Sequence, residues 1–205
     1  SPAGGYTLMA EADIPLHADL ADPDALFDLG FPDGESAVVA ATEVTAFRML
    51  PGDDVSCLNL YQPESPRILG VPPGRVEGRF NFQQLLRETD DPWSLLEADF
   101  GDVVPAFADH ESALWILKTG LGKDLIVENE RGEPVSLRFV GLFEKGLFQS
   151  EVLISEKHFK EHFPSRTGYS FFLLDPPPGT SAETADILER RLGDYGFDVT
   201  PTQER

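Results

Sequence analysis

The sequence has one cysteine, Cys57, in 205 residues, so no disulfide can form within the chain. Val55 and Leu58 flank this thiol, which favours a small core residue over a nucleophile. The number of cysteines alone does not show whether the protein resides in an oxidising or a reducing compartment. The sequence also lacks an apolar run near the ~20 residues that cross a bilayer, and no signal peptide opens it at Ser1. We expect a globular piece of a longer protein.

Basic residues are scarce as well. Lys and Arg number 16 against 36 Asp and Glu, which gives a formal net charge of −20. Binding of nucleic-acid phosphates depends on Lys and Arg, so we do not expect nucleic acid to be a partner. Flat docking on anionic lipid is disfavoured for the same reason. We interpret the acidity as a feature of a well-solvated surface.

Apolar residues are sufficient for a packed core, and their patterning predicts an α+β fold with mixed sheets. Alternation and turn residues predict strands, and capping residues predict helices. The expected strands are Tyr6–Leu16, Ala37–Leu50, Val55–Tyr61, Arg79–Phe82, Val103–Phe107, Asp124–Glu128, Val135–Phe139, Val152–Ile154, Tyr169–Leu174 and Phe197–Thr200. The expected helices begin near Asp22, Asp91, Asp109, Ser155 and Ser181. The last strand–helix–strand has a connection long enough for a parallel crossover.

One string has a catalytic pattern. His158-Phe159-Lys160-Glu161-His162 matches H-x-x-E-H, in which two histidines one helical turn apart share a zinc and the glutamate is the general base. Pro164 limits this helix to about two turns, and the later glutamates available as a third ligand are Glu183, Glu189 and Glu204. The alternative is an amphipathic helix that buries Phe159 and Phe163 and turns its histidines and Lys160 to solvent. We favour that alternative and expect no metal and no cofactor.

Other acidic clusters have simpler explanations. Asp22, Asp24, Asp28 and Asp33 lack the alternating acids and central glycine of a calcium loop, so capping and solvation are the expected roles. The sequence has no G-x-S-x-G elbow, no Walker lysine loop and no dinucleotide fingerprint. We therefore expect a protein that is not an enzyme.

The segment Gly141–Gln149 is unusual because apolar residues stand on both sides of a predicted hairpin tip at Lys145-Gly146. Hairpin tips are normally polar. Phe143, Leu147 and Phe148 either fold back onto the core or form an exposed patch for a partner. We favour the first alternative, in which they fold back onto the core. Under the second alternative, these three residues are the candidate partner contact.

Three groups of strings resemble a known family, the FtsX-like or MacB-type permease subunits of ABC transporters, in their extracytoplasmic core domain. The strings are Val55–Pro63 with Pro66–Val71, Trp115–Leu117 with Leu121–Leu125, and Phe148–Glu156 with Phe163-Pro164 and Gly168-Tyr169. The resemblance extends from about Tyr6 to the end of the chain. It carries no catalytic motif, and no binding residue of the family can be placed here.

The resemblance implies a domain held between the first and second of four transmembrane helices, outside the cytoplasmic membrane. It also implies two parts. Residues 1–62 and 157–205 form a porter-like subdomain with βαβ elements, and residues 63–156 form an inserted β-rich subdomain. A separate cytoplasmic ATPase drives such permeases, which act as dimers with a second permease subunit.

We therefore expect a non-catalytic transporter ectodomain that couples ATP hydrolysis to handling of a cargo or partner protein. Two alternatives stay open. One is a zinc-dependent hydrolase that uses His158, Glu161 and His162, and the other is a freestanding secreted binding module.

Overall fold

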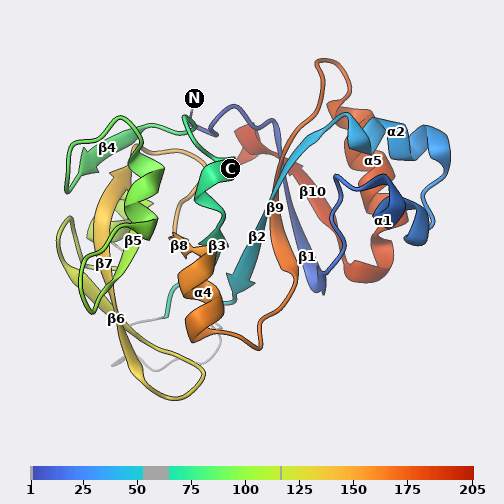
Figure 1. Ribbon diagram of the computed structural model, residues 1–205. Coiled ribbons are helices and arrows are strands. Elements are labelled where there is room, and N and C mark those ends of the chain that lie inside the picture. Colours follow the sequence, from blue (N-terminus) through green and yellow to red (C-terminus); the bar gives the residue numbers. More distant parts are fainter. Residues whose placement is uncertain (1, 53–64, 116) are drawn as a thin grey trace. The chain divides into compact units, whose positions relative to one another are not determined.

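The computed structural model describes residues 2–52, 65–115 and 117–205 (Figure 1). These residues form two compact units. The terminal unit contains Gly5–Phe47 and Thr167–Arg205, and the middle unit contains Ser1–Gly4 and Arg48–Arg166. The strand predicted at Val55–Tyr61, with Cys57, lies outside the described residues.

The terminal unit is built on a sheet with the strand order β10-β1-β9-β2. β1 (Leu8–Leu16) runs antiparallel to both β9 (Tyr169–Asp175) and β10 (Asp198–Pro201). β9 and β10 therefore run in the same direction with β1 between them, and α5 (Ser181–Arg191) connects them. The strand–helix–strand prediction for the end of the chain is confirmed.

One face of this sheet carries the core of the terminal unit. Side chains that alternate along β1 and β9 pack with residues of α5 and of the short helices α1 (Pro23–Asp28) and α2 (Asp33–Ala40). These side chains include Leu8, Ala10, Leu26, Val39, Phe172, Leu174, Ile187 and Leu188. The sequence also contributes a cap, because the Asp22 side chain accepts a hydrogen bond from the Asp24 N–H at 3.0 Å. Capping is the role expected for this aspartate.

The strand predicted at Ala37–Leu50 is wrong in its first part. Residues 33–40 form α2, and the strand β2 covers only Glu43–Leu50. Asp33 and Glu35 lie in the first turn of α2, where acidic side chains favour the helix. Glu35 also pairs with Arg191 of α5 at 2.7 Å and with Arg190 at 2.9 Å. Val39 is fully buried in the core of this unit, and such tertiary packing overrides the strand propensity of Val38 and Val39.

The middle unit holds a mixed sheet. Arg48–Leu50 of β2 pairs with β3 (Ile68–Val71), and the order continues β3-β8-β5-β7-β4. The other strands are β4 (Phe82–Leu85), β5 (Val104–Asp109), β6 (Asp124–Glu128), β7 (Pro134–Phe143) and β8 (Val152–Ser155), with β6 paired to β7. β3 and β8 are parallel, as are β5 and β7. The α+β fold class with mixed sheets is confirmed.

Three local predictions for the middle unit need correction. The strand predicted at Arg79–Phe82 is wrong in its bounds, because β4 covers Phe82–Leu85. β5 lies between β7 and β8, so the segment around Lys145 is not a hairpin tip. The helix predicted at Asp91 is a 3-10 helix, η2 (Pro92–Glu97). The middle unit also contains η1 (Pro73–Arg75), α3 (His110–Trp115) and α4 (Glu156–His162). Two further 3-10 turns, η3 (Gly193–Tyr195) and η4 (Thr202–Glu204), belong to the terminal unit.

The bounds of the units differ from the predicted subdomains 1–62 with 157–205 and 63–156. Residues 157–166 lie in the middle unit, because Phe159 and Phe163 of this segment are in its core. Helix α4 packs closely on β3. A Cβ at Gly70 would lie 2.8 Å from the Cβ of Phe159, so only glycine allows this approach.

Among the described residues, none of the helices combines the length and the apolar character that crossing a membrane requires.

Candidate functional site

Helix α4 is the element that carries the one catalytic-looking string. The Ser155 side chain accepts a hydrogen bond from the His158 N–H at 3.1 Å and begins the helix. Phe159 and Phe163 are 0% and 3% exposed, and Lys160 is exposed. The amphipathic helix is confirmed for these three residues. His158 and His162 are half-buried rather than turned fully to solvent.

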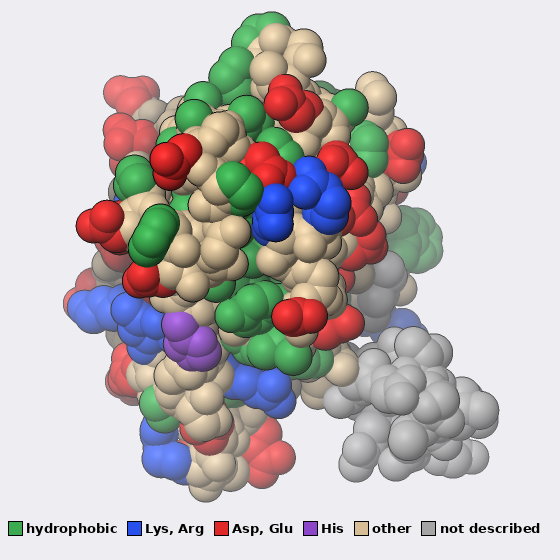
Figure 2. Space-filling model, turned by 90° about the vertical axis from the view of Figure 1, so that its right-hand side faces the viewer, with side chains coloured by type: hydrophobic (Ala, Val, Ile, Leu, Met, Phe, Trp, Pro, Cys, Tyr) green, Lys and Arg blue, Asp and Glu red, His purple; other side chains and the backbone are tan. Residues whose placement is uncertain are grey.

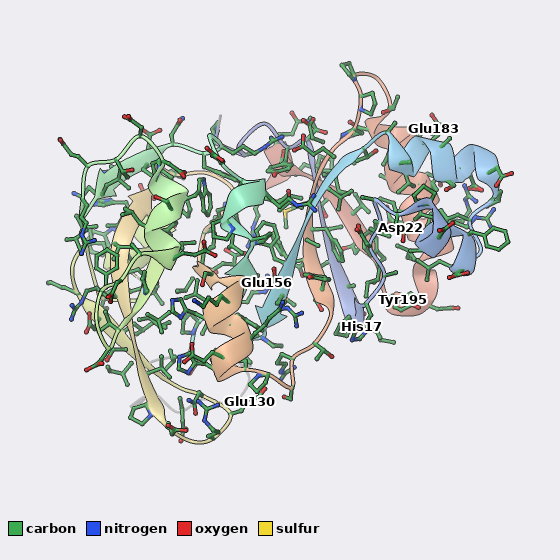
Figure 3. All side chains as sticks on the ribbon, viewed as in Figure 1. His17, Asp22, Glu130, Glu156, Glu183 and Tyr195 are labelled. Carbon is green, nitrogen blue, oxygen red and sulfur yellow. The ribbon has the colours of Figure 1, made fainter. Side chains whose placement is uncertain are left out.

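The two histidines have neighbours that do not form a metal site. His158 Nδ1 lies 3.7 Å from Glu161 Oε2, and His162 Nδ1 lies 3.3 Å from Asn129 Nδ2. In the described part of the chain, no three or more His, Cys, Asp or Glu side chains group to hold a metal ion. Glu183 (Figure 3), Glu189 and Glu204, the suggested third ligands, belong to the terminal unit. The zinc hypothesis therefore gains no support from the described residues.

His162 instead helps to hold the turn between β6 and β7 against the end of α4. Asn129 Oδ1 accepts hydrogen bonds from the backbone N–H groups of Arg131 and Glu133, both at 3.0 Å. This fixes the amide so that its NH2 group points at His162 Nδ1. The backbone N–H of Glu130 (Figure 3) also donates to the His162 carbonyl at 3.2 Å. A neutral ring accepts from Asn129, and a protonated ring cannot.

Burial lowers the pKa of His162 below its ordinary value, as do the charges of Arg131 and His158, against the opposite effect of Glu161 and Glu133. The folded protein therefore binds the proton less readily than the unfolded chain does. The neutral ring contributes its full stabilisation at pH values above the ordinary pKa of about 6.5. This contribution is lost as the pH falls from there through the lowered pKa of the folded state.

We accordingly expect the denaturant concentration at the unfolding midpoint to decrease as the pH is lowered from 7.5 to 5. In His162→Gln this decrease should be smaller, because glutamine does not titrate. The measurement is denaturant unfolding of both proteins across that range. His17→Gln is a matched control, since His17 lies in the other unit. An unchanged pH slope in His162→Gln would contradict the assignment.

A groove of about 790 Å³ runs along the outer face of α4. Its walls are the segment Pro72–Arg75, Glu97 at the end of η2, and the α4 residues Glu156, Lys157, Lys160 and Glu161. Its charges are of both signs and partly neutralise each other. Glu156 (Figure 3) pairs with Arg48 at 3.0 Å and with Lys160 at 3.5 Å. The groove has the size of a ligand site, and two of its lining residues, Glu156 and Lys160, form an ion pair with each other.

The candidate partner contact is covered in the structure. Phe143, Leu147 and Phe148 are 3%, 3% and 2% exposed, so they fold back onto the core and form no exposed patch. Phe143 and Phe148 belong to an aromatic cluster with Phe80, Phe82, Trp93 and Phe107. Sequence reasoning missed this cluster because its members come from β4, η2, β5, β7 and the loops, which are far apart in the chain.

The acidic side chains on one face of the molecule are spread rather than gathered. On the face shown in Figure 2, acidic side chains are scattered over the surface, and the few basic ones stand in small groups among them. Such a distribution fits a solvated surface better than a single cation site.

No protein-family model matches the chain, and no curated protein matches it. Solved structures match the chain at low sequence identity. The periplasmic region of MacB from Actinobacillus actinomycetemcomitans has a TM-score of 0.49 and 13% identity, over 99% of this chain and 92% of that one.

Two further structures accompany it. The extracellular domain of the ABC-type transporter YknZ from Gram-positive bacteria has a TM-score of 0.42 and 17% identity, over 95% and 99% of the two chains. A domain of a putative permease from Porphyromonas gingivalis has a TM-score of 0.35 and 12% identity, over 98% and 89%.

Proposed function

We propose that this chain is a non-catalytic extracytoplasmic domain of an FtsX-like, or MacB-type, ABC transporter permease. The observation that carries the proposal is the construction of the terminal unit. Both ends of the chain build one βαβ-containing unit, and the middle of the chain forms a second unit between them. The resemblance of the sequence strings implies this same plan. The external face of the cytoplasmic membrane is the proposed location.

The proposed mechanism is mechanical. A cytoplasmic ATPase hydrolyses ATP, the membrane part of the permease transmits the change, and a pair of permease subunits moves its outer domains to act on a cargo or partner protein.

The test uses the full reading frame reconstituted in lipid with its ATPase. In a Cys57→Ser background, spin labels are placed at Phe27 and Ile126, which are 72% and 60% exposed and lie one in each unit. We expect the distance distribution between the labels to change between the nucleotide-free and ATP-trapped states. A label pair at Leu86 and Ile126, both in the middle unit, is the control and should not change.

An ATPase inactivated in its nucleotide site should abolish the change. Distances that are the same in all nucleotide states would overturn the mechanical role. A reading frame with a cleavable signal peptide and no membrane span would overturn the permease assignment and favour the secreted module.

A further inference from the structure

Strand β6 lies on an edge of the sheet in the middle unit. Among the described strands, β7 is the only one that pairs with it, from Asp124 opposite Arg138 to Glu128 opposite Pro134. The other side of β6 therefore carries backbone groups that no described strand satisfies. Such an edge can accept a further strand through main-chain hydrogen bonds.

Two hydrogen bonds at the ends of β6 show which of its backbone groups face β7. The Phe139 N–H donates to the Lys123 carbonyl at 3.0 Å, and the Asn129 N–H donates to the Glu133 carbonyl at 2.9 Å. Bonded and non-bonded pairs alternate along an antiparallel ladder, so the odd-numbered residues of β6 bond to β7. The even-numbered residues point their N–H and C=O groups away from β7, and these residues are Asp124, Ile126 and Glu128.

The side chains of β6 offer apolar contacts beside this free edge. Val127 is buried in the core of the middle unit, and Leu125 packs against that core while remaining half-buried. Ile126 points to the opposite face of the sheet and is 60% exposed. A strand added next to β6 would place its own side chains beside Leu125 and Ile126, where cross-strand pairs of β-branched residues stabilise a sheet.

Both ends of β6 are held in place by other parts of the middle unit. At its start, the Arg138 guanidinium donates two hydrogen bonds to the Asp124 carboxylate, at 2.7 and 3.0 Å. Just beyond its end, the Glu130 N–H donates to the His162 carbonyl at 3.2 Å and ties the turn to α4. The edge is therefore ordered in advance, and binding a strand costs little conformational entropy on this side.

Charge decides which kind of strand fits this edge. Asp124 is neutralised by Arg138, whereas Glu128 is exposed and makes no ion pair with any residue that the structure describes. A basic side chain opposite Glu128 would be stabilising and an acidic one would not. A second copy, paired antiparallel about Ile126, would set Glu128 opposite Asp124, and both copies would carry a net charge of −20. A basic segment of another protein is the better match.

We propose that the free edge of β6 is a docking site for an extended segment of a partner protein, which adds to the sheet as an antiparallel strand. The segment carries a basic residue opposite Glu128 and a β-branched apolar residue opposite Ile126. This site does not rest on the transporter assignment, because it depends only on the geometry and charge of β6.

The test titrates the whole 205-residue chain with the peptide acetyl-Lys-Val-Val-Val-Thr-amide, whose lysine would stand opposite Glu128, while backbone amide resonances are followed. We expect saturable shifts at Ile126 and Glu128. At a peptide concentration of about ten times the dissociation constant, exchange of these two amides with water should slow about tenfold. The amides of Leu125 and Val127 already bond to β7, so their exchange rates should stay unchanged and serve as the internal control.

Two changes separate the backbone pairing from the charge. A peptide with proline as its middle residue cannot donate to the Ile126 carbonyl and should cause no saturable shift. A peptide with glutamate in place of lysine should bind about threefold or more weakly than the lysine peptide, and Glu128→Lys should reverse this preference. Glu183→Lys makes the same charge change on an exposed residue of the terminal unit and should leave the preference unaltered.

Absence of saturable shifts at Ile126 and Glu128, or equal binding of the proline peptide, would overturn the docking edge. Equal binding of the lysine and glutamate peptides would overturn the basic character of the partner. A dimer that forms without peptide and shifts the Ile126 amide as the protein concentration rises would show that a second copy takes the edge, and would overturn the choice of partner.

Discussion

Replacing Phe159 with alanine is expected to lower the free energy of unfolding by about 3–5 kcal/mol, the range for removing a large aromatic side chain from a core. Phe159 is fully buried on α4, 5.4 Å in ring centroid from Phe163. The surrounding residues cannot easily fill the cavity that the lost ring leaves, because α4 already lies against β3 at Gly70. The measurement is urea unfolding followed by circular dichroism.

The matched control is His158→Ala, one residue earlier on the same helix. His158 is half-buried and its contact with Glu161 is a long 3.7 Å, so the expected loss is about 1 kcal/mol or less. This order of effects separates a structural helix from a histidine-centred site. A larger loss in His158→Ala than in Phe159→Ala would reject the structural role of α4.

The second large effect concerns Glu151, a carboxylate with no exposed surface. Its Oε2 accepts hydrogen bonds from the backbone N–H groups of Gln149 at 3.0 Å and Ser150 at 3.1 Å. Its Oε1 lies 3.7 Å from Arg67. Glu151→Ala removes the acceptor and the negative charge together, and we expect a loss of about 3 kcal/mol.

Two variants divide this effect into its causes. Glu151→Gln keeps an acceptor oxygen for the two N–H groups and removes only the charge, so its expected loss is smaller, about 1–2 kcal/mol. Adding Arg67→Met to Glu151→Gln should cost less than Arg67→Met alone, because the charge that faces Arg67 is already gone. Equal losses for Glu151→Gln and Glu151→Ala would show that the charge matters more than the acceptor.

Local features of α4 were predictable from the sequence. Ser155 is a good N-cap, Phe159 and Phe163 are one turn apart, and Pro164 follows the helix. The same holds for Asp22 before α1 and for the strands on either side of α5. Each of these signals acts over a few residues, so no knowledge of distant contacts was needed.

Predictions failed where distant residues decide the outcome. Ala37–Ala40 reads as a strand by composition, yet it is helical, and Val39 packs there into the core of the terminal unit. The segment around Lys145 reads as a hairpin, yet β5 inserts between the two strands. Register and strand order depend on contacts between segments that are far apart, and a local pattern carries little information about them.

By itself, the sequence determined the α+β class, most helix and strand positions and the acidic character of the chain. These follow from composition, periodicity and capping. Tertiary structure alone decided that Leu147 and Phe148 are buried, and that His158 and His162 belong to no group of three metal-ligating side chains among the described residues. Burial and ligand geometry arise from side chains that meet only when separate segments pack together.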